Sequence, residues 1–363
     1  MPNQTKTRRK SFTPKRSGKT GLPAGTLVHL GERKIAHAAI TLIEYEAATL
    51  KETRFESLAA CQACTPTLPK LWLNVHGLHE PEVMQEIGKH FHLHPLVLED
   101  ILNTNQRPKI EDYGDYLFLV ARFFNYDATA LTITTEQVSF VIGSNFVLTF
   151  QERPTGNFDP VREWLHSDKG RIRQLGTDYL AYALLDLIID RYFTVLEQIG
   201  ERTEDLEDEL LANPNAAQLQ TLHHLKRETL IMRRNIWPLR EVVNTLVRNE
   251  SRFFTPETQL YLRDIYDHTV HLIESLEAIR DLIAGMLDIY LSSISNRVNQ
   301  EVRALTVFAL IFMPATLISG IFGMNFKTMP LLDEPFGFFF AIGLMVCVAA
   351  TLGLIFWRRR WLA

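Results

Sequence analysis

Oxygen-bearing side chains recur at helical spacing in the C-terminal third of the chain. Asp288, Asn299 and Thr316 lie on one stripe of an α-helix, since they and the residues between them recur at intervals of three, four or eleven. The other members of the stripe are Val302, Leu305 or Thr306, Ala309, Met313 and Gly320. Carboxylate, amide and hydroxyl oxygens are ligands that Mg²⁺ prefers, and apolar constrictions between them can gate by dewetting. Ordinary helix packing is the alternative, and it fits the apolar members better than the polar ones.

The same helical run leads into Gly323, Met324 and Asn325. Mg²⁺ gives up its bound waters reluctantly, so a site that passes this ion must hold it weakly. The neutral amide oxygen of Asn325, facing a hydrated ion, meets that requirement. Gly323 permits a tight turn where a helix ends. Asn325 also fits a simple helix C-cap, and the residues by themselves leave both roles open.

Part of this stripe lies in one of two long stretches without charged side chains. Ala304 to Phe326 and Pro335 to Trp357 each contain 23 residues. As helices they reach ~34 Å, enough to cross a hydrocarbon core of ~30 Å. Arg303 precedes the first stretch and three arginines, 358–360, follow the second, so both termini are expected in the cytoplasm. The alternative is a pair of buried core helices.

Composition excludes several classes of protein. The chain has 363 residues, a net charge of −4 and three cysteines, which argues against a dedicated nucleic-acid binder and a disulfide scaffold. No nucleophile elbow, P-loop, dinucleotide fingerprint or zinc-protease motif occurs, so we expect no enzyme. Cys61 and Cys64, and the histidines His90, His92 and His94, have metal-ligand spacing but are more simply interpreted as ordinary side chains.

The elements that must position these residues form an α+β membrane protein. Short β-rich runs predict strands at residues 26–29, 40–45, 71–75, 116–124, 131–142 and 145–150, with helices over 80–91 and 95–102. This order predicts a cytosolic α/β domain with a mixed sheet. Helical periodicity then predicts long helices over 178–212 and 216–250, and from Pro256 onward. No proline lies between Pro256 and Pro314, so one helix of ~65 residues is expected to enter the first apolar stretch.

We therefore divide the chain into seven parts. They are a basic disordered arm (1–24), the cytosolic α/β domain (25–175), the long-helix region and stalk (176–303), the first transmembrane helix (304–326), an external loop (327–335), the second transmembrane helix (336–357) and a basic cytosolic tail (358–363).

Gly-Met-Asn directly after the first of two C-terminal spans is the signature of the CorA family of divalent-cation channels. Further segments that resemble the family are residues 94–103, 106–109, 236–241, 266–269, 288–293 and 312–316. The resemblance covers nearly the whole chain after about residue 20. It implies a homopentameric funnel in which five copies of the long helix line the pore, with the Gly-Met-Asn loops as the selectivity filter.

The resemblance also implies regulatory metal sites. Asp100 and Asp264 match the family positions that bind Mg²⁺ between neighbouring subunits, and Glu99, Asp186 and Asp190 lie close to its second regulatory site. High internal Mg²⁺ is then expected to close the pore. The family usually has a bulky Met where this chain has Val302, so the resemblance does not settle how tight this constriction is.

The predicted function is Mg²⁺ influx down the membrane potential, with Co²⁺ and Ni²⁺ as secondary ions, across the plasma (inner) membrane of a prokaryotic cell. The expected partners are the lipid bilayer, divalent cations and four further copies of the chain. Two alternatives stay open. One is a proton-coupled Zn²⁺ transporter of the same superfamily, and the other is a metal-sensing membrane scaffold that conducts nothing.

Overall fold

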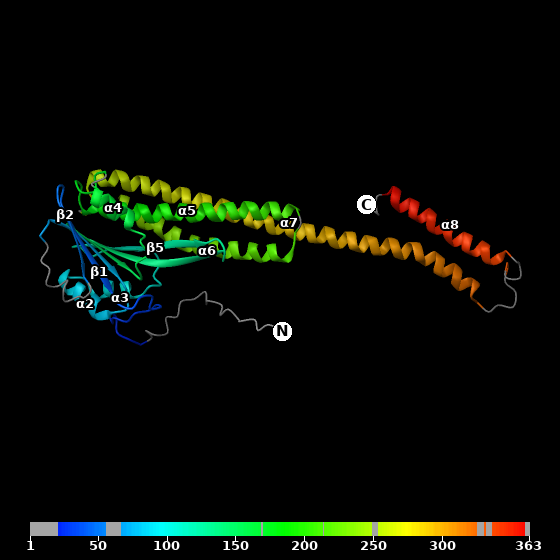
Figure 1. Cartoon of the computed structure of the whole chain (residues 1–363), viewed down its shortest axis with the longest axis horizontal. Helices are drawn as coiled ribbons and strands as arrows, with labels where there is room; N and C mark the ends of the chain where they lie inside the picture. Colours follow the sequence, from blue (N-terminus) through cyan, green and yellow to red (C-terminus); the bar gives the residue numbers. More distant parts are fainter. Residues whose placement is uncertain are drawn as a thin grey trace. The chain divides into compact units, whose positions relative to one another are not determined.

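A computed structural model describes residues 21–55, 67–167, 170–212, 214–248, 253–324, 330–331 and 336–359 (Figure 1). Asn325, Cys61, Cys64 and most of the expected external loop lie outside these ranges, as do residues 1–20 and 360–363. The chain divides into two compact units, residues 1–207 with 220–284 and residues 208–219 with 285–363. The expected α/β domain and most of the helices that follow it therefore belong to one unit.

A seven-stranded mixed sheet forms the centre of the first unit. Its strands in spatial order are β2 (Leu50–Phe55), β1 (Ala39–Tyr45), β3 (Lys70–His76), β7 (Phe146–Gln151), β6 (Thr132–Ile142), β5 (Leu117–Asp127) and β4 (Lys109–Asp112). Only the β3–β7 pair is parallel, with Leu73 opposite Leu148, and the other neighbours are antiparallel. The mixed sheet predicted from the sequence is confirmed.

Helices cover both faces of this sheet, which explains why β1 and β3 are buried almost throughout. On one face, α2 (Pro81–His90) and α3 (Pro95–Leu102) contribute Met84 and Ile101 to a core that includes Leu73 of β3. Because side chains alternate along a strand, the neighbouring Trp72 points to the opposite face. There its ring meets Phe158, which precedes α4 (Asp159–Ser167), at 6.1 Å between ring centroids.

Three long helices follow. They are α5 (Thr177–Ala212), α6 (Ala216–Arg248) and α7 (Pro256–Phe322), and α6 and α7 continue through Pro238 and Pro314. Figure 1 shows α5 and α6 running beside the sheet. Glu228 connects α6 to the sheet, because its buried carboxylate accepts the backbone N–H of Ile133 in β6 at 2.7 Å. The single unbroken helix predicted from Pro256 into the apolar stretch is confirmed, at 67 residues.

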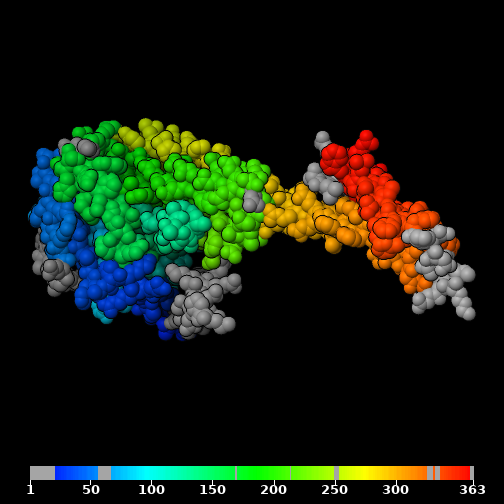
Figure 2. All heavy atoms as spheres, turned by 45° about the vertical axis from the view of Figure 1, so that its right-hand side comes forward, coloured from blue at the N-terminus to red at the C-terminus, as the bar shows by residue number. Residues whose placement is uncertain are grey.

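The second unit contains the C-terminal part of α7 and α8 (Gly337–Arg358). Both helices are long and apolar enough to span a membrane, and only 6% of each apolar window is buried within the chain. Figure 2 shows their atoms, in orange and red, largely uncovered. Core helices are mostly buried, so the alternative of two buried core helices is wrong for this chain.

Some short elements differ from the prediction. The expected strand at 26–29 is absent, and Leu30 instead makes one bridge to Asn103 at the end of α3. The polar edge strands β2 and β4, and helix α4, were not predicted. Edge strands carry charged side chains that protect the sheet from further pairing, so they lack the apolar alternation by which strands are recognised.

Phe158 is the centre of the aromatic packing on the α4 face of the sheet. It is 2% exposed and its ring contacts Trp72, Phe123 and Phe140. We expect Phe158→Ala to lower the free energy of unfolding of the first unit by about 3–5 kcal/mol, because it leaves a cavity among three rings. Urea denaturation followed by tryptophan fluorescence measures this. Leu211→Ala, at a side chain that is 64% exposed, is the control. Equal losses in both variants would contradict this packing role.

Candidate functional site

Two of the predicted acidic residues come together with a histidine between α5 and α7. Asp186 and Asp190 lie one turn apart on α5, and His268 lies on α7. One ligand atom from each of the three residues lies within 4.8 Å of the others. The helices are held together nearby by Tyr179 and Tyr261, whose rings meet edge to face at 5.2 Å. Among the described residues this is the one group of three with metal-ligand geometry.

Asp264 lies at the margin of this acidic cluster. Its carboxylate oxygen Oδ2 is 3.8 Å from Nε2 of His268, one turn along α7. The other imidazole nitrogen, Nδ1, is buried and has no hydrogen-bond partner. The structure thus brings Asp186, Asp190 and Asp264, all predicted from the sequence, around a histidine for which no role was predicted. The i, i+4 spacing of Asp264 and His268 is the signal that could have identified it.

The electrostatics of the cluster favour a bound cation. The pKa of the Asp186 carboxyl is raised to about 6, first by burial and then by the negative charge of Asp190. Asp264 adds to this effect, while His268 and the Tyr182 hydroxyl, 3.5 Å from Oδ2, oppose it. A divalent ion would relieve the repulsion between the carboxylates. The donor set fits such an ion, because carboxylates suit Mg²⁺ and an imidazole suits Co²⁺, Ni²⁺ or Zn²⁺.

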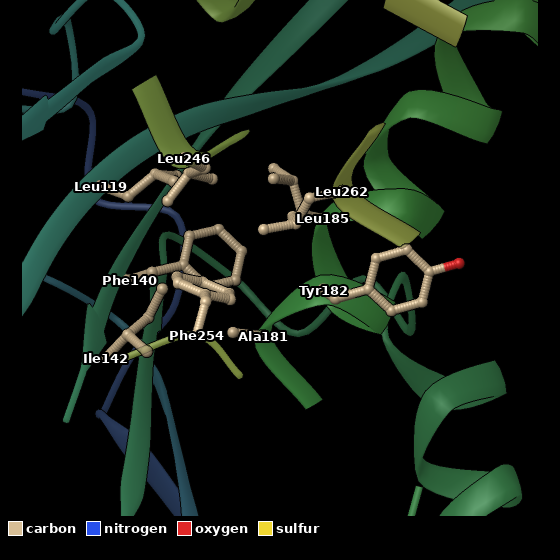
Figure 3. A pocket seen from close by; sticks show the side chains of 9 residues that line it. All are labelled: Leu119, Phe140, Ile142, Ala181, Tyr182, Leu185, Leu246, Phe254 and Leu262. Carbon is tan, nitrogen blue, oxygen red and sulfur yellow. The ribbon is translucent and has the colours of Figure 1, made fainter. Parts of the chain in front are cut away.

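Tyr182 connects the cluster to the core of the first unit. Its ring borders a small apolar hollow, and Figure 3 shows its hydroxyl directed away from the other lining side chains. The hollow is lined by Leu119, Phe140, Ile142, Ala181, Leu185, Leu246, Phe254 and Leu262, which come from the sheet, α5, α6, the segment before α7 and α7 itself. Its volume of about 10 Å³ is no larger than one water requires, so it is a packing gap and no substrate pocket.

Asp100 and Glu99 lie on α3, in a different environment from the acidic cluster. Within one chain neither residue joins the three-residue group found among the described residues. The Asp100 carboxylate accepts hydrogen bonds from Gln106 Nε2 at Oδ1 and from Lys109 Nζ at Oδ2, the second at 2.5 Å. Glu99 Oε2 accepts the backbone N–H of Gly25 at 2.5 Å. The predicted pairing of Asp100 with Asp264 joins two subunits, so it stays a prediction.

Two of the three closely spaced histidines, at the end of α2 and the start of α3, have local roles. His94 is the N-cap of α3, and its Nδ1 accepts the backbone N–H of Leu96 at 3.2 Å. His90 packs edge to face on Phe91 at 4.9 Å. These contacts favour the simple interpretation of the histidine spacing over a transition-metal site.

The predicted stripe on α7 is exposed along its whole length in the single chain. Its members are Asp288, Asn299, Val302, Leu305 or Thr306, Ala309, Met313, Thr316 and Gly320. At about 100° per residue they fall within an arc of roughly 120°. Most neighbouring positions are exposed too, so exposure alone does not distinguish the stripe. The Thr316 hydroxyl donates to the carbonyl of Phe312 at 2.9 Å, which leaves its oxygen lone pairs directed outward.

A surface hollow extends this stripe to the end of α7. Met313, Thr316 and Gly320 line it together with Leu317, Ile321 and Met324. Helix α7 ends at Phe322. The backbone N–H of Met324 then bonds the carbonyl of Ile321 at 3.2 Å, which is the tightened last turn expected at Gly323. Asn325, the third residue of the predicted filter, lies outside the described residues.

Known proteins resemble the chain in sequence and in fold. A profile of the family described as CorA-like Mg²⁺ transporter protein matches residues 70–360. The cobalt/magnesium transport protein CorA of Thermotoga maritima is 42% identical over 350 residues, an alignment that covers 95% of this chain and 98% of that protein. The CorA magnesium transporter of Methanocaldococcus jannaschii superposes with a TM-score of 0.76 at 23% identity, over 90% of this chain and 99% of that one. At that identity the superposition establishes the fold.

A zinc transporter is a more distant relative. The zinc transport protein ZntB of Yersinia pseudotuberculosis is 22% identical over 295 residues, covering 80% of this chain and 88% of that protein.

The raised pKa of Asp186 has a measurable consequence for stability. Its folded-state value of about 6 exceeds the ordinary 3.8, so the folded chain binds this proton more tightly than the unfolded chain. Without divalent metal, the free energy of unfolding should therefore fall as the pH rises from about 4 to about 6 and stay low at pH 7. Asp186→Asn removes this loss, and we expect about 1 kcal/mol higher stability at pH 7.

Thermal unfolding of the detergent-solubilised protein in EDTA, at pH 4.5 and 7.5, measures the effect. Asp267→Asn, an exposed neighbour on α7, is the control. The same pH dependence in wild type and Asp186→Asn would contradict the assignment.

Proposed function

Because the chain belongs to the CorA-like Mg²⁺ transporter family, we propose that it is a channel that admits Mg²⁺ down the membrane potential, with Co²⁺ and Ni²⁺ as secondary ions. The family is one of transporters and not of enzymes. The observation that carries the proposal is the exposed stripe on α7, in which Asn299 and Thr316 stand among apolar residues on a helix apolar enough to span a membrane. A helix that only anchored the protein would have no use for such oxygens.

The stripe requires other copies of the chain to form a pore. A single α7 exposes its oxygens on one side, whereas five copies around an axis would surround an ion with them at each level. We assign residues 304–326 and 336–357 as the two spans, with the stripe facing the pore and α8 in an outer ring. Val302, Leu305 and Met313 then form apolar constrictions, and the Gly323–Asn325 loops form the entrance. Val302 is smaller than methionine, so its constriction depends more on how closely the helices approach.

The driving force is electrical. A charge that crosses the membrane gains ~2.3 kcal/mol per 100 mV, so a divalent ion gains about twice that. With both termini in the cytoplasm, an inside-negative potential draws Mg²⁺ inward through a prokaryotic plasma membrane. Hydrated Mg²⁺ facing the neutral oxygens of Asn325, Thr316 and Asn299 is held weakly enough to leave.

We further propose that internal Mg²⁺ closes the channel. Asp264 of one subunit and Asp100 of its neighbour would hold one ion, with Glu99, Asp186 and Asp190 at a second site. Mg²⁺ bridges carboxylates that otherwise repel, so it stabilises the arrangement that brings them together and shifts the population toward the closed state. The support is the raised pKa of Asp186, for which burial is the first cause and the charges of Asp190 and Asp264 are further ones, together with the contact between Asp264 and His268.

One observation favours a second candidate, a Zn²⁺ transporter. His268 stands among two carboxylates with a buried, unpartnered Nδ1, and imidazole is a better ligand for Zn²⁺ than for Mg²⁺. This histidine lies in the predicted regulatory cluster and not on the stripe, so it bears on the regulatory ion more than on the permeating one.

Asn325→Ala tests the filter. We expect Mg²⁺ uptake into proteoliposomes to fall at least about tenfold, since the amide oxygens that face the hydrated ion are gone. Asn145→Ala, at an exposed turn between β6 and β7, is the control and should transport normally. Full uptake by Asn325→Ala would refute the proposed role of Asn325 in the filter. Full uptake by a variant that also lacks the side-chain oxygens of Asn299 and Thr316 would refute the proposal that the stripe lines the pore.

Asp264→Lys tests the regulatory site. The lysine ammonium replaces the bound cation, so inhibition of uptake by internal Mg²⁺ should require about tenfold more Mg²⁺ or disappear. Asp267→Lys reverses a charge one turn away on an exposed position of the same helix and should leave inhibition unchanged. Equal inhibition of wild type and Asp264→Lys would remove Asp264 from the regulatory site.

A further inference from the structure

Lys109 already occupies the carboxylate that the proposed function assigns to Mg²⁺. Its Nζ lies 2.5 Å from Oδ2 of Asp100 and 2.6 Å from Oε1 of Glu111. The side chains of Lys109 and Asp100 are 27% and 18% exposed, so the ion pair is partly shielded from water. The other Asp100 oxygen is taken by Gln106. Asp100 is therefore a neutralised carboxylate in the single chain.

The position of Lys109 is fixed by the fold and not by a flexible loop. Lys109 is the first residue of β4, where it pairs with Val120 of β5. Its ammonium also lies 5.4 Å from the centre of the Phe118 ring. Burial alone would lower the pKa of Lys109, but the hydrogen bonds to Asp100 and Glu111 raise it above its ordinary value. The lysine thus carries its charge throughout the physiological pH range.

From these contacts we infer that Lys109 is a tethered competitor of the regulatory cation and sets the Mg²⁺ concentration at which Asp100 is occupied. The inference rests on the proposed role of Asp100. A divalent ion at Oδ2 would lie within a few ångströms of the ammonium, and repulsion between the two cations in this partly buried site opposes its binding unless the ammonium moves away. Glu111 provides the alternative partner, since it lies two residues along the strand and already holds the same Nζ.

Glu111 is itself positioned for this exchange. Its second oxygen, Oε2, accepts the hydroxyl of Tyr113 at 3.0 Å. Lys109 can therefore release Asp100 and stay paired with Glu111, so the exchange needs no unpaired ammonium in a half-buried site. Without Glu111, the lysine would have Asp100 as its one carboxylate partner among these contacts and would compete more strongly.

The two substitutions at this site have opposite expected effects on Mg²⁺ binding. Lys109→Met removes the competitor and keeps an apolar stem of similar length, so the Mg²⁺ concentration for half-maximal binding should fall about tenfold. Glu111→Gln should raise the Mg²⁺ concentration for half-maximal binding about threefold. Adding Glu111→Gln to Lys109→Met should raise this concentration by less than threefold, because the competing lysine is already gone. If Lys109 only fastened β4 to α3, its substitution would change stability without these opposite shifts in Mg²⁺ binding.

The experiment is Mg²⁺-dependent protection of the purified full-length protein from limited proteolysis, which needs no transport. Lys89→Met, which removes a lysine paired with Glu86 at 2.6 Å on the surface of α2, is the matched control and should not shift the midpoint. An unchanged or raised midpoint in Lys109→Met overturns the inference, and should that variant not fold, an unchanged or lowered midpoint in Glu111→Gln overturns it equally. Asp100→Asn separates the two claims. If it leaves the midpoint unchanged, the proposed role of Asp100 fails, whereas a raised midpoint without the Lys109 effect refutes the inference alone.

Discussion

Repulsion between carboxylates that packing holds close together is the interaction on which the proposed regulation depends. Asp186 and Asp190 are placed one turn apart by α5, and α7 adds Asp264 and His268 to the same place. The cost appears in the pKa of Asp186, which burial raises first and the charges of Asp190 and Asp264 raise further. A divalent cation removes this cost, so the stability of the arrangement depends on metal concentration. Asp264 lies on the helix that continues to Thr316 and Phe322, so the proposed regulatory site and the proposed pore share one element.

The two acidic regions of the first unit differ in how their negative charge is compensated. In the α5–α7 cluster, burial and the neighbouring Asp190 raise the pKa of Asp186 to about 6, so the charge of this carboxyl depends on pH near neutrality. At α3, a lysine of the neighbouring edge strand neutralises Asp100. A proton is lost as the pH rises, whereas a tethered ammonium stays. The first region should therefore respond to both pH and metal, and the second mainly to metal. The sheet fixes this difference, because it holds β4 beside α3.

Sequence patterns predicted the long elements well and the short polar ones poorly. Periodicity extended over dozens of residues identified α5, α6 and the unbroken α7, and β-branched alternation identified the central strands. The edge strands β2 and β4 were missed because exposed strands need charges where a buried strand has apolar residues. Residues 26–29 have strand composition but form no strand. The chain next to them pairs with the end of α3 instead, where the backbone N–H of Leu30 donates to the carbonyl of Leu102, so tertiary contacts outweigh the local strand preference.

The site residues also divide into those that the sequence indicated and those that only the fold brings together. Asp186, Asp190 and Asp264 came from resemblance, and the structure places them around one point. His268 was missed because its role depends on α5, a helix far away in the sequence, although its spacing from Asp264 was visible. The Lys109–Asp100 pair joins a helix to an edge strand that was not predicted, so no sequence pattern indicated it. The stripe on α7 follows from helical spacing, since a helix repeats its faces regularly, and its role as a pore lining stays a prediction.

The measurement that tests the central claim most directly is Mg²⁺ uptake into liposomes that contain only this protein, under an imposed potassium diffusion potential and no pH gradient. We predict uptake that increases with an inside-negative potential and is unaffected by a proton ionophore when the potential is clamped. Absence of Mg²⁺ uptake, together with Zn²⁺ uptake that requires a proton gradient, would contradict the proposed channel.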